Sequence, residues 1–140
     1  YSSPVQVGAL TNWGKVFAGS YSTFAITTDG ALWSWGSSTW GQLGHNDTIR
    51  RSSPVQVGTL LNWSKVDCDG ESAVDTATAI KTDGTLWTWG NNAKGTLGVN
   101  DIIARSSPVQ LGALATWDLA KVGGPNNTGG SNFILAIEKT

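Results

Sequence analysis

His45 is the only histidine in this 140-residue chain, and Cys68 is the only cysteine. A metal centre or a nucleophilic triad needs several converging ligands or an oriented base, and a lone histidine supplies neither. The sequence also has no Gly-x-Ser-x-Gly elbow, phosphate-binding loop, His-Glu-x-x-His or paired-cysteine motif. We therefore expect a non-enzymatic protein without a catalytic, cofactor or metal site, and we interpret His45 as a solvated loop residue available to a partner.

Four carboxylates crowd residues 67–75, and a glycine lies among them. Oxygen ligands at alternate positions suit a calcium loop, but the third acidic ligand before the glycine and a distal bidentate glutamate are missing. The pattern favours a polar surface bulge and leaves calcium binding as the alternative. Aspartates on both sides of Cys68 disfavour its thiolate, so we expect no reactive thiol there.

Three arginines and one tryptophan are candidates for partner contact. Arg50 and Arg51, with Arg105 at the matching place of a later repeat, would form a basic row that binds a carboxylate or a phosphate. Trp40 lies where the next repeat has Lys94, and an indole outside the repeated pattern is a typical contact residue.

The charges nearly balance, which excludes several classes of partner. Nine basic and ten acidic residues give a net charge of −1, and 14% of the residues are charged. Such a chain offers no basic surface for nucleic acid or for an anionic membrane. No stretch is apolar and long enough to cross a bilayer. We expect neither nucleic-acid binding nor membrane insertion.

The elements that position these residues come from an internal repeat. The phrase Ser-Ser-Pro-Val-Gln begins at Ser2, Ser52 and Ser106, and Asp-Gly-x-Leu-Trp-x-Trp-Gly begins at Asp29 and Asp83. We divide the chain into repeat 1 (residues 1–50), repeat 2 (51–104) and a partial repeat 3 (105–140). Repeat 2 has a four-residue insertion near residues 67–76.

Each repeat reads as four short strands, and the sequence leaves no room for a helix. In repeat 1, residues 4–7, 15–18, 23–27 and 32–35 are β-branched or aromatic and are separated by turn residues. The Asp-Gly pairs predict tight hairpins with positive φ angles between the last two strands. Trp33 and Trp35 fall on one face of their strand and need a covering sheet. We expect Trp35→Ala or Trp89→Ala to cost about 3–5 kcal/mol.

These phrases, followed by Gly-x-Leu-Gly, resemble the repeats of the regulator of chromosome condensation family over nearly the whole chain, in a spelling closer to bacterial and bacteriophage members. The resemblance implies an all-β fold, a β-propeller of four-stranded antiparallel blades that is usually seven-bladed. The third copy stops at residues 136–140, before its Asp-Gly phrase. We expect an incomplete propeller that is a segment of a larger ring. The alternatives are a ring completed between chains and a face buried on another protein.

The resemblance also bears on function. The nuclear member promotes nucleotide release from a small GTPase and touches chromatin, whereas bacterial members include a β-lactamase inhibitor and large surface or virion proteins. We predict a scaffold in a virion or cell-surface protein, with an extracellular or virion-associated location. Its partners would be other subunits or the remaining blades, bound through the loops that differ between repeats, with glycan contact as a further prediction. The alternative is a regulatory propeller, either an exchange factor or an enzyme inhibitor.

Overall fold

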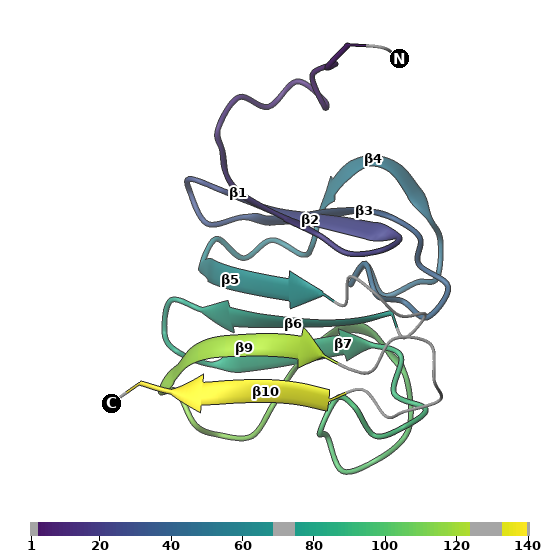
Figure 1. The fold of residues 1–140 in the computed structure, drawn as a ribbon. Coiled ribbons are helices and arrows are strands. Elements are labelled where there is room, and N and C mark those ends of the chain that lie inside the picture. The colour runs from purple at the N-terminus through teal and green to yellow at the C-terminus, as the bar shows by residue number, and fades with distance from the viewer. Residues whose placement is uncertain (1–2, 69–74, 124–132, 140) are drawn as a thin grey trace.

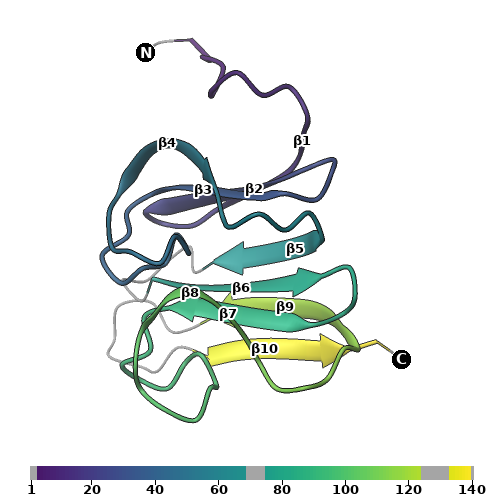
Figure 2. The same cartoon turned by 180° about the vertical axis from the view of Figure 1, so that it is seen from behind.

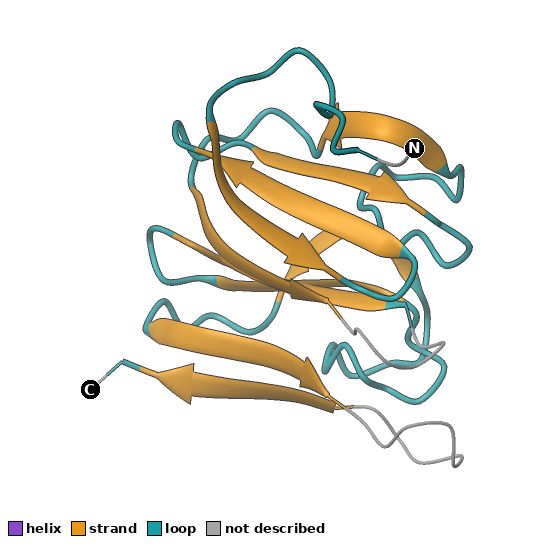
Figure 3. Cartoon of the chain, turned by 45° about the horizontal axis from the view of Figure 1, so that its top comes forward, coloured by secondary structure: helices purple, strands orange, loops and turns teal. Residues whose placement is uncertain are grey.

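The computed structural model describes residues 3–68, 75–123 and 133–139, and within them all regular structure is β-strand, as predicted (Figure 3). Sheet 1 contains β1 (Trp13–Ala18), β2 (Ser22–Thr27), β3 (Leu32–Gly36) and β4 (Arg51–Gln56). Sheet 2 contains β5 (Trp63–Cys68), β6 (Thr76–Lys81), β7 (Leu86–Gly90) and β8 (Arg105–Gln110). Sheet 3 contains β9 (Trp117–Gly123) and β10 (Phe133–Glu138).

The three sheets are stacked face to face in chain order, with sheet 2 between the others (Figures 1 and 2). All neighbouring strands within a sheet are antiparallel. Strand β5 contacts β1 and β2 on one side and β9 on the other. Sheets 1 and 2 therefore have the strand order and the packing of adjacent propeller blades.

The sheets are offset from the sequence repeats. The second Ser-Ser-Pro-Val-Gln phrase forms β4, which pairs with β3 of repeat 1, and the third forms β8, which pairs with β7. The strand predicted at residues 4–7 is not formed. The reason is that this phrase completes the sheet of the preceding repeat, and among the described residues the first copy has no earlier Leu-Trp-x-Trp-Gly strand to pair with.

The Asp-Gly hairpins join β2 to β3 and β6 to β7, as predicted, but only their glycines have positive φ angles, 88° at Gly30 and 80° at Gly84. The prediction of positive φ at the aspartates was wrong, because a third loop residue lets the turn close with the glycine alone in the left-handed region. A Cβ atom on Gly30 would lie 2.3 Å from the Leu61 carbonyl oxygen. Gly30 thus also allows the turn to pack against the next repeat.

The core between sheets 1 and 2 is built on Trp89, which is fully buried. Its ring meets Phe24 of sheet 1 edge-on, with centroids 5.9 Å apart. Trp33 and Trp35, the counterparts of Trp87 and Trp89, are only partly buried, because they lie on the face of sheet 1 that is turned away from sheet 2. The predicted covering of the indoles is confirmed at Trp89, whereas within the described residues no further sheet covers Trp35.

Candidate protein-interaction site

The loops that follow β3 (residues 37–50) and β7 (residues 91–104) occupy equivalent places in sheets 1 and 2, and both lie on the same side of the stack (Figure 1). Each loop is braced by one aspartate. Asp47 accepts hydrogen bonds from the Ile49 N–H at 2.9 Å and from Arg51 at 2.6 Å. The loop in repeat 2 repeats this arrangement with Asp101, the Ile103 N–H and Arg105.

These contacts place the predicted basic row. Arg51 and Arg105 are each paired with an aspartate four residues earlier and each donate to a carbonyl of their own loop. The pKa of Asp47 is lowered first by the Ile49 N–H and then by Arg51. Arg50 is exposed, and none of the ion pairs within the described residues includes it. Two of the three arginines therefore brace their loops, and contact with a partner stays a prediction for all three.

His45 is half-buried, so the prediction of a solvated loop histidine was wrong. Its Nε2 lies 3.0 Å from the Ser34 hydroxyl, which in turn donates to the Leu43 carbonyl at 2.7 Å. Burial lowers the pKa of His45, and the positive charge of Arg51 lowers it further. The ring therefore favours its neutral form and packs against the sheet, and its role in partner contact stays a prediction.

Trp40, a predicted contact residue, has 44% of its surface exposed. Three isoleucines on the two loops are more exposed still: Ile49 (62%), Ile102 (69%) and Ile103 (64%). We call these four side chains the loop rim. Sequence reasoning missed the isoleucines because it compared charged and aromatic residues, although Ile49 and Ile103 occupy matching positions in the two repeats.

The main chain below Trp40 is held firmly by sheet 2. The buried Trp89 indole donates to the Gln42 carbonyl at 2.7 Å, and the Asn46 N–H donates to the Ser106 carbonyl at 2.6 Å. Gly41, with φ 76°, lies so close to β8 that an added Cβ would be 2.5 Å from the Cα of Ser106. The framework of two blades therefore fixes the loop from which Trp40 projects.

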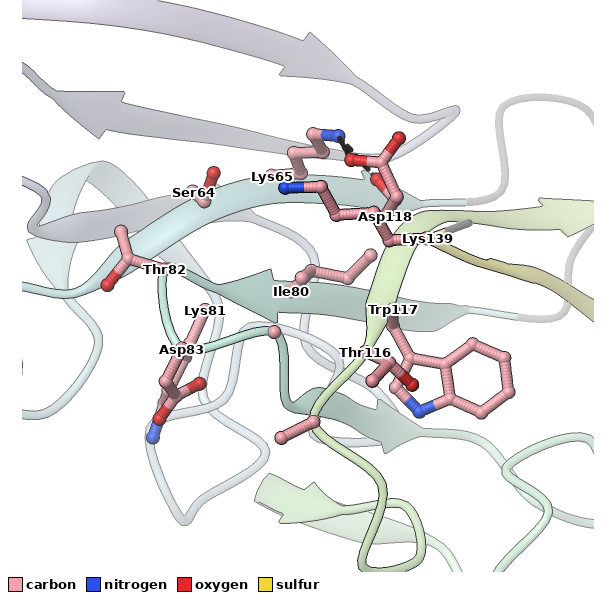
Figure 4. Close-up of a pocket in the computed structure, with 12 residues that line it drawn as sticks. Ser64, Lys65, Ile80, Lys81, Thr82, Asp83, Thr116, Trp117, Asp118 and Lys139 are labelled. Carbon is pink, nitrogen blue, oxygen red and sulfur yellow. Dashed lines mark hydrogen bonds and ion pairs between the residues drawn. The ribbon is translucent and has the colours of Figure 1, made fainter.

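A second set of contacts joins β5 of sheet 2 to β9 of sheet 3. Lys65 donates to Asp118 at 2.8 Å, above a cavity of about 210 Å³ between sheets 2 and 3 (Figure 4). Lys65 also lowers the pKa of Asp118, through its hydrogen bond and then its charge. A second bridge has its acceptor in β5 and its donors in β9: Asp67 accepts hydrogen bonds from the Lys121 side chain and from the Val122 N–H.

Metal binding was left as an alternative for the acidic segment, and residues 69–74 of that segment lie outside the described residues. Asp67 itself uses both carboxylate oxygens to bind sheet 3. Within the parts that the structure describes, no three His, Cys, Asp or Glu side chains gather as metal ligands. The same parts of the chain contain no helix able to cross a membrane.

Stacked four-stranded antiparallel sheets joined by hairpins and bearing variable loops on one side define an incomplete β-propeller, a protein-interaction module. The model for the regulator of chromosome condensation (RCC1) repeat matches residues 29–73 and 83–124, and a second model of this repeat matches residues 15–42. The chain therefore belongs to this family.

Among curated relatives, human E3 ubiquitin-protein ligase HERC2 is 29% identical over 89% of this chain and 2% of its own length. The mitochondrial RCC1 domain-containing protein RUG3 of Arabidopsis thaliana is 30% identical over 81% of this chain and 25% of its own length. The RCC2 homolog of Danio rerio is 39% identical over 52% of this chain and 14% of its own length. The chain thus spans a quarter or less of these relatives.

Solved structures show the same fold. Yeast RCC1 (Prp20), crystallised with Kap60, superposes with a TM-score of 0.73 over 96% of this chain and 32% of its own, at 15% identity. Human WBSCR16 gives a TM-score of 0.68 over 91% of this chain and 36% of its own, at 23% identity. The resemblance to bacterial and bacteriophage members is not tested by these relatives and stays a prediction.

Proposed function

We propose that this chain is a non-enzymatic scaffold that binds a protein partner through the loop rim. The observation that carries the proposal is Trp40, which exposes 44% of its surface on a loop whose main chain is anchored to the neighbouring blade. Aromatic side chains on rigid supports are typical of the residues that contribute most to protein binding. The balanced charge supports a protein partner rather than nucleic acid, and glycan contact stays a prediction.

Two settings are proposed for this scaffold. Its polar, weakly charged composition supports assembly in a virion or on a cell surface, as does the predicted resemblance of its repeats to bacterial and bacteriophage members. Binding of a regulatory client is the second candidate, supported by relatives: the structure of Prp20p from Saccharomyces cerevisiae was described together with its binding properties to Gsp1p and histones. The proposed scaffold role is the same in both settings, and the settings differ in the partner.

Affinity capture with the full chain tests the proposal. We expect Trp40→Ala to reduce partner capture at least tenfold, the effect of losing a central aromatic contact. The matched control is Lys94→Ala, at the equivalent position of repeat 2, which should capture normally. The unfolding free energy of both variants should lie within about 0.5 kcal/mol of the wild-type value, because the changed side chains lie in loops.

The captured partner distinguishes the two settings. Recovery of a small GTPase with faster nucleotide release, or of an inhibited enzyme, would favour the regulatory role. Recovery of virion or surface subunits would favour assembly. Equal capture by wild type and Trp40→Ala would refute the loop rim as the binding site, and turnover of a substrate by the purified chain would refute the non-enzymatic role.

A further inference from the structure

A cavity of about 470 Å³ lies between sheets 1 and 2, apart from the loop rim. The indoles of Trp63 and Trp87 line it together with apolar side chains such as Val57, Leu60 and Pro108. His45 and Lys81 are among its polar lining residues. Its volume and its mainly apolar wall with a few polar groups are typical of sites for small ligands.

Lys81 is the unusual member of this wall. It ends β6, and only 6% of its surface is exposed. Its Nζ lies 3.6 Å from the centre of the Trp87 ring and 4.8 Å from that of Trp63. The two π faces attract the ammonium group but do not neutralise its charge.

No anion of the described residues pairs with this ammonium group. The four ion pairs of the described chain all involve other residues. Asp83 lies near Lys81 (Figure 4), but its Oδ1 accepts hydrogen bonds from the N–H and the hydroxyl of Thr85 at 3.0 and 2.7 Å. Burial lowers the pKa of Lys81 although the charge of Asp83 opposes that shift, so a negative group closer to Nζ would stabilise the ammonium form.

Comparison with the other sheets shows that the fold does not require a lysine here. Lys81 is the register partner of Trp63, as Thr27 is of Trp13 and Glu138 is of Trp117. Equivalent positions of the three sheets, each paired with an equivalent tryptophan, thus have a neutral, a basic and an acidic side chain. Among these three positions, the lysine is particular to the junction between sheets 1 and 2.

We propose that this cavity binds an apolar group that carries a carboxylate. The carboxylate pairs with the Lys81 ammonium, and the apolar body lies against Trp63 and Trp87. Such a group is provided by a free small acid or by the C-terminal residue of a peptide, and the same contacts serve both. Binding here does not depend on the loop rim.

The test uses the full chain labelled with ¹⁵N and titrated with 3-phenylpropionate, with its neutral amide as the matched probe. We expect saturable shifts of the Trp63 and Trp87 indole N–H signals, and at least tenfold weaker binding of the amide. Lys81→Met should reduce the affinity for 3-phenylpropionate tenfold or more. Lys94→Met, which changes an exposed loop lysine, should leave this affinity unchanged. The peptide Gly-Gly-Phe, with a free or an amidated C-terminus, distinguishes the two sources by its affinity relative to the free acid.

Equal affinity for acid and amide would overturn the proposal, because it would mean a merely apolar cavity. So would unchanged binding by Lys81→Met, or shifts confined to other indoles. The comparison of acid with amide is made on the wild-type chain, and it therefore holds even if Lys81→Met fails to fold.

Discussion

Trp89 and Trp35 occupy equivalent positions of the two blades, and the structure predicts that their loss has unequal effects. Trp89 is fully buried between sheets 1 and 2, whereas Trp35 is only partly buried on the outer face of sheet 1. Trp35 contacts Trp13 at a ring-centroid distance of 6.2 Å, without a covering sheet among the described residues. The sequence predicted the same loss of stability for Trp35→Ala and Trp89→Ala, and the structure corrects this to a smaller loss for Trp35→Ala.

The magnitude for Trp89→Ala follows from its burial and from two contacts that would be lost with it. Removing a fully enclosed large aromatic side chain costs about 3–5 kcal/mol of unfolding free energy. That loss includes the edge-on contact with Phe24 and leaves the Gln42 carbonyl, now bonded at 2.7 Å, without its donor. For Trp35→Ala we expect about 1–2 kcal/mol, because Trp35 is partly exposed and the space it leaves on the outer face would be open to water rather than an enclosed cavity.

Urea unfolding followed by far-ultraviolet circular dichroism measures both variants without relying on tryptophan emission. The slope of free energy against urea should stay unchanged, so that a shift in midpoint reports stability alone. Equal losses in the two variants would refute the assignment of Trp89 to the interior and Trp35 to the outer face. A loss below about 1 kcal/mol for Trp89→Ala would refute the packing of sheet 1 on sheet 2.

Three further predictions concern the loops. Gly41→Ala should cost at least about 1 kcal/mol more than Gly95→Ala in urea unfolding, because both glycines have positive φ but only Gly41 lies against the backbone of Ser106; equal costs would contradict that packing. Since the folded pKa of His45 is lowered, its contribution to stability is present above the unfolded pKa of about 6.5 and is lost as the pH falls through the folded value. Unfolding between pH 7.5 and 5 should thus be less pH-dependent in His45→Val, and an identical dependence would exclude the buried ring. Asp101 has a lowered pKa, caused first by the Ile103 N–H, so its contribution is present above about pH 3.9 and lost at lower pH; Asp101→Asn should reduce the acid sensitivity of unfolding, and unchanged acid sensitivity would contradict this.

The sequence predicted the strands and hairpins because their signals are local. The alternating side chains of β2 and β3 and the turn residues between them all lie within a short stretch of sequence. The pairing of β4 with β3 was missed. The Ser-Ser-Pro-Val-Gln phrase begins each repeat of the sequence, and nothing local to it indicates whether its strand joins the sheet of its own repeat or that of the preceding one. That choice depends on the edge left open by the preceding sheet, which is a property of the assembled fold.

The candidate site was predicted less well, because burial decides what a charged side chain does. Arg51 and Arg105 looked like a free basic row, but each has an aspartate four residues earlier that braces its loop. That spacing is visible in the sequence and was the available signal. Lys81 was overlooked although it replaces Thr27 of the first repeat, and only the structure shows that its ammonium group lies against two indole rings.

Differences between equivalent positions separate framework from function in this chain. Ser34 and Thr88 are equivalent, both are buried, and both bond a loop carbonyl, so a change of residue there preserves the same contact. Trp40 and Lys94 are both exposed and share no packing role, and Lys81 introduces a charge where Thr27 has none. A position that varies while its packing role is kept is explained by the fold alone. Trp40 and Lys81 are not explained in this way, and the two binding proposals therefore rest on them.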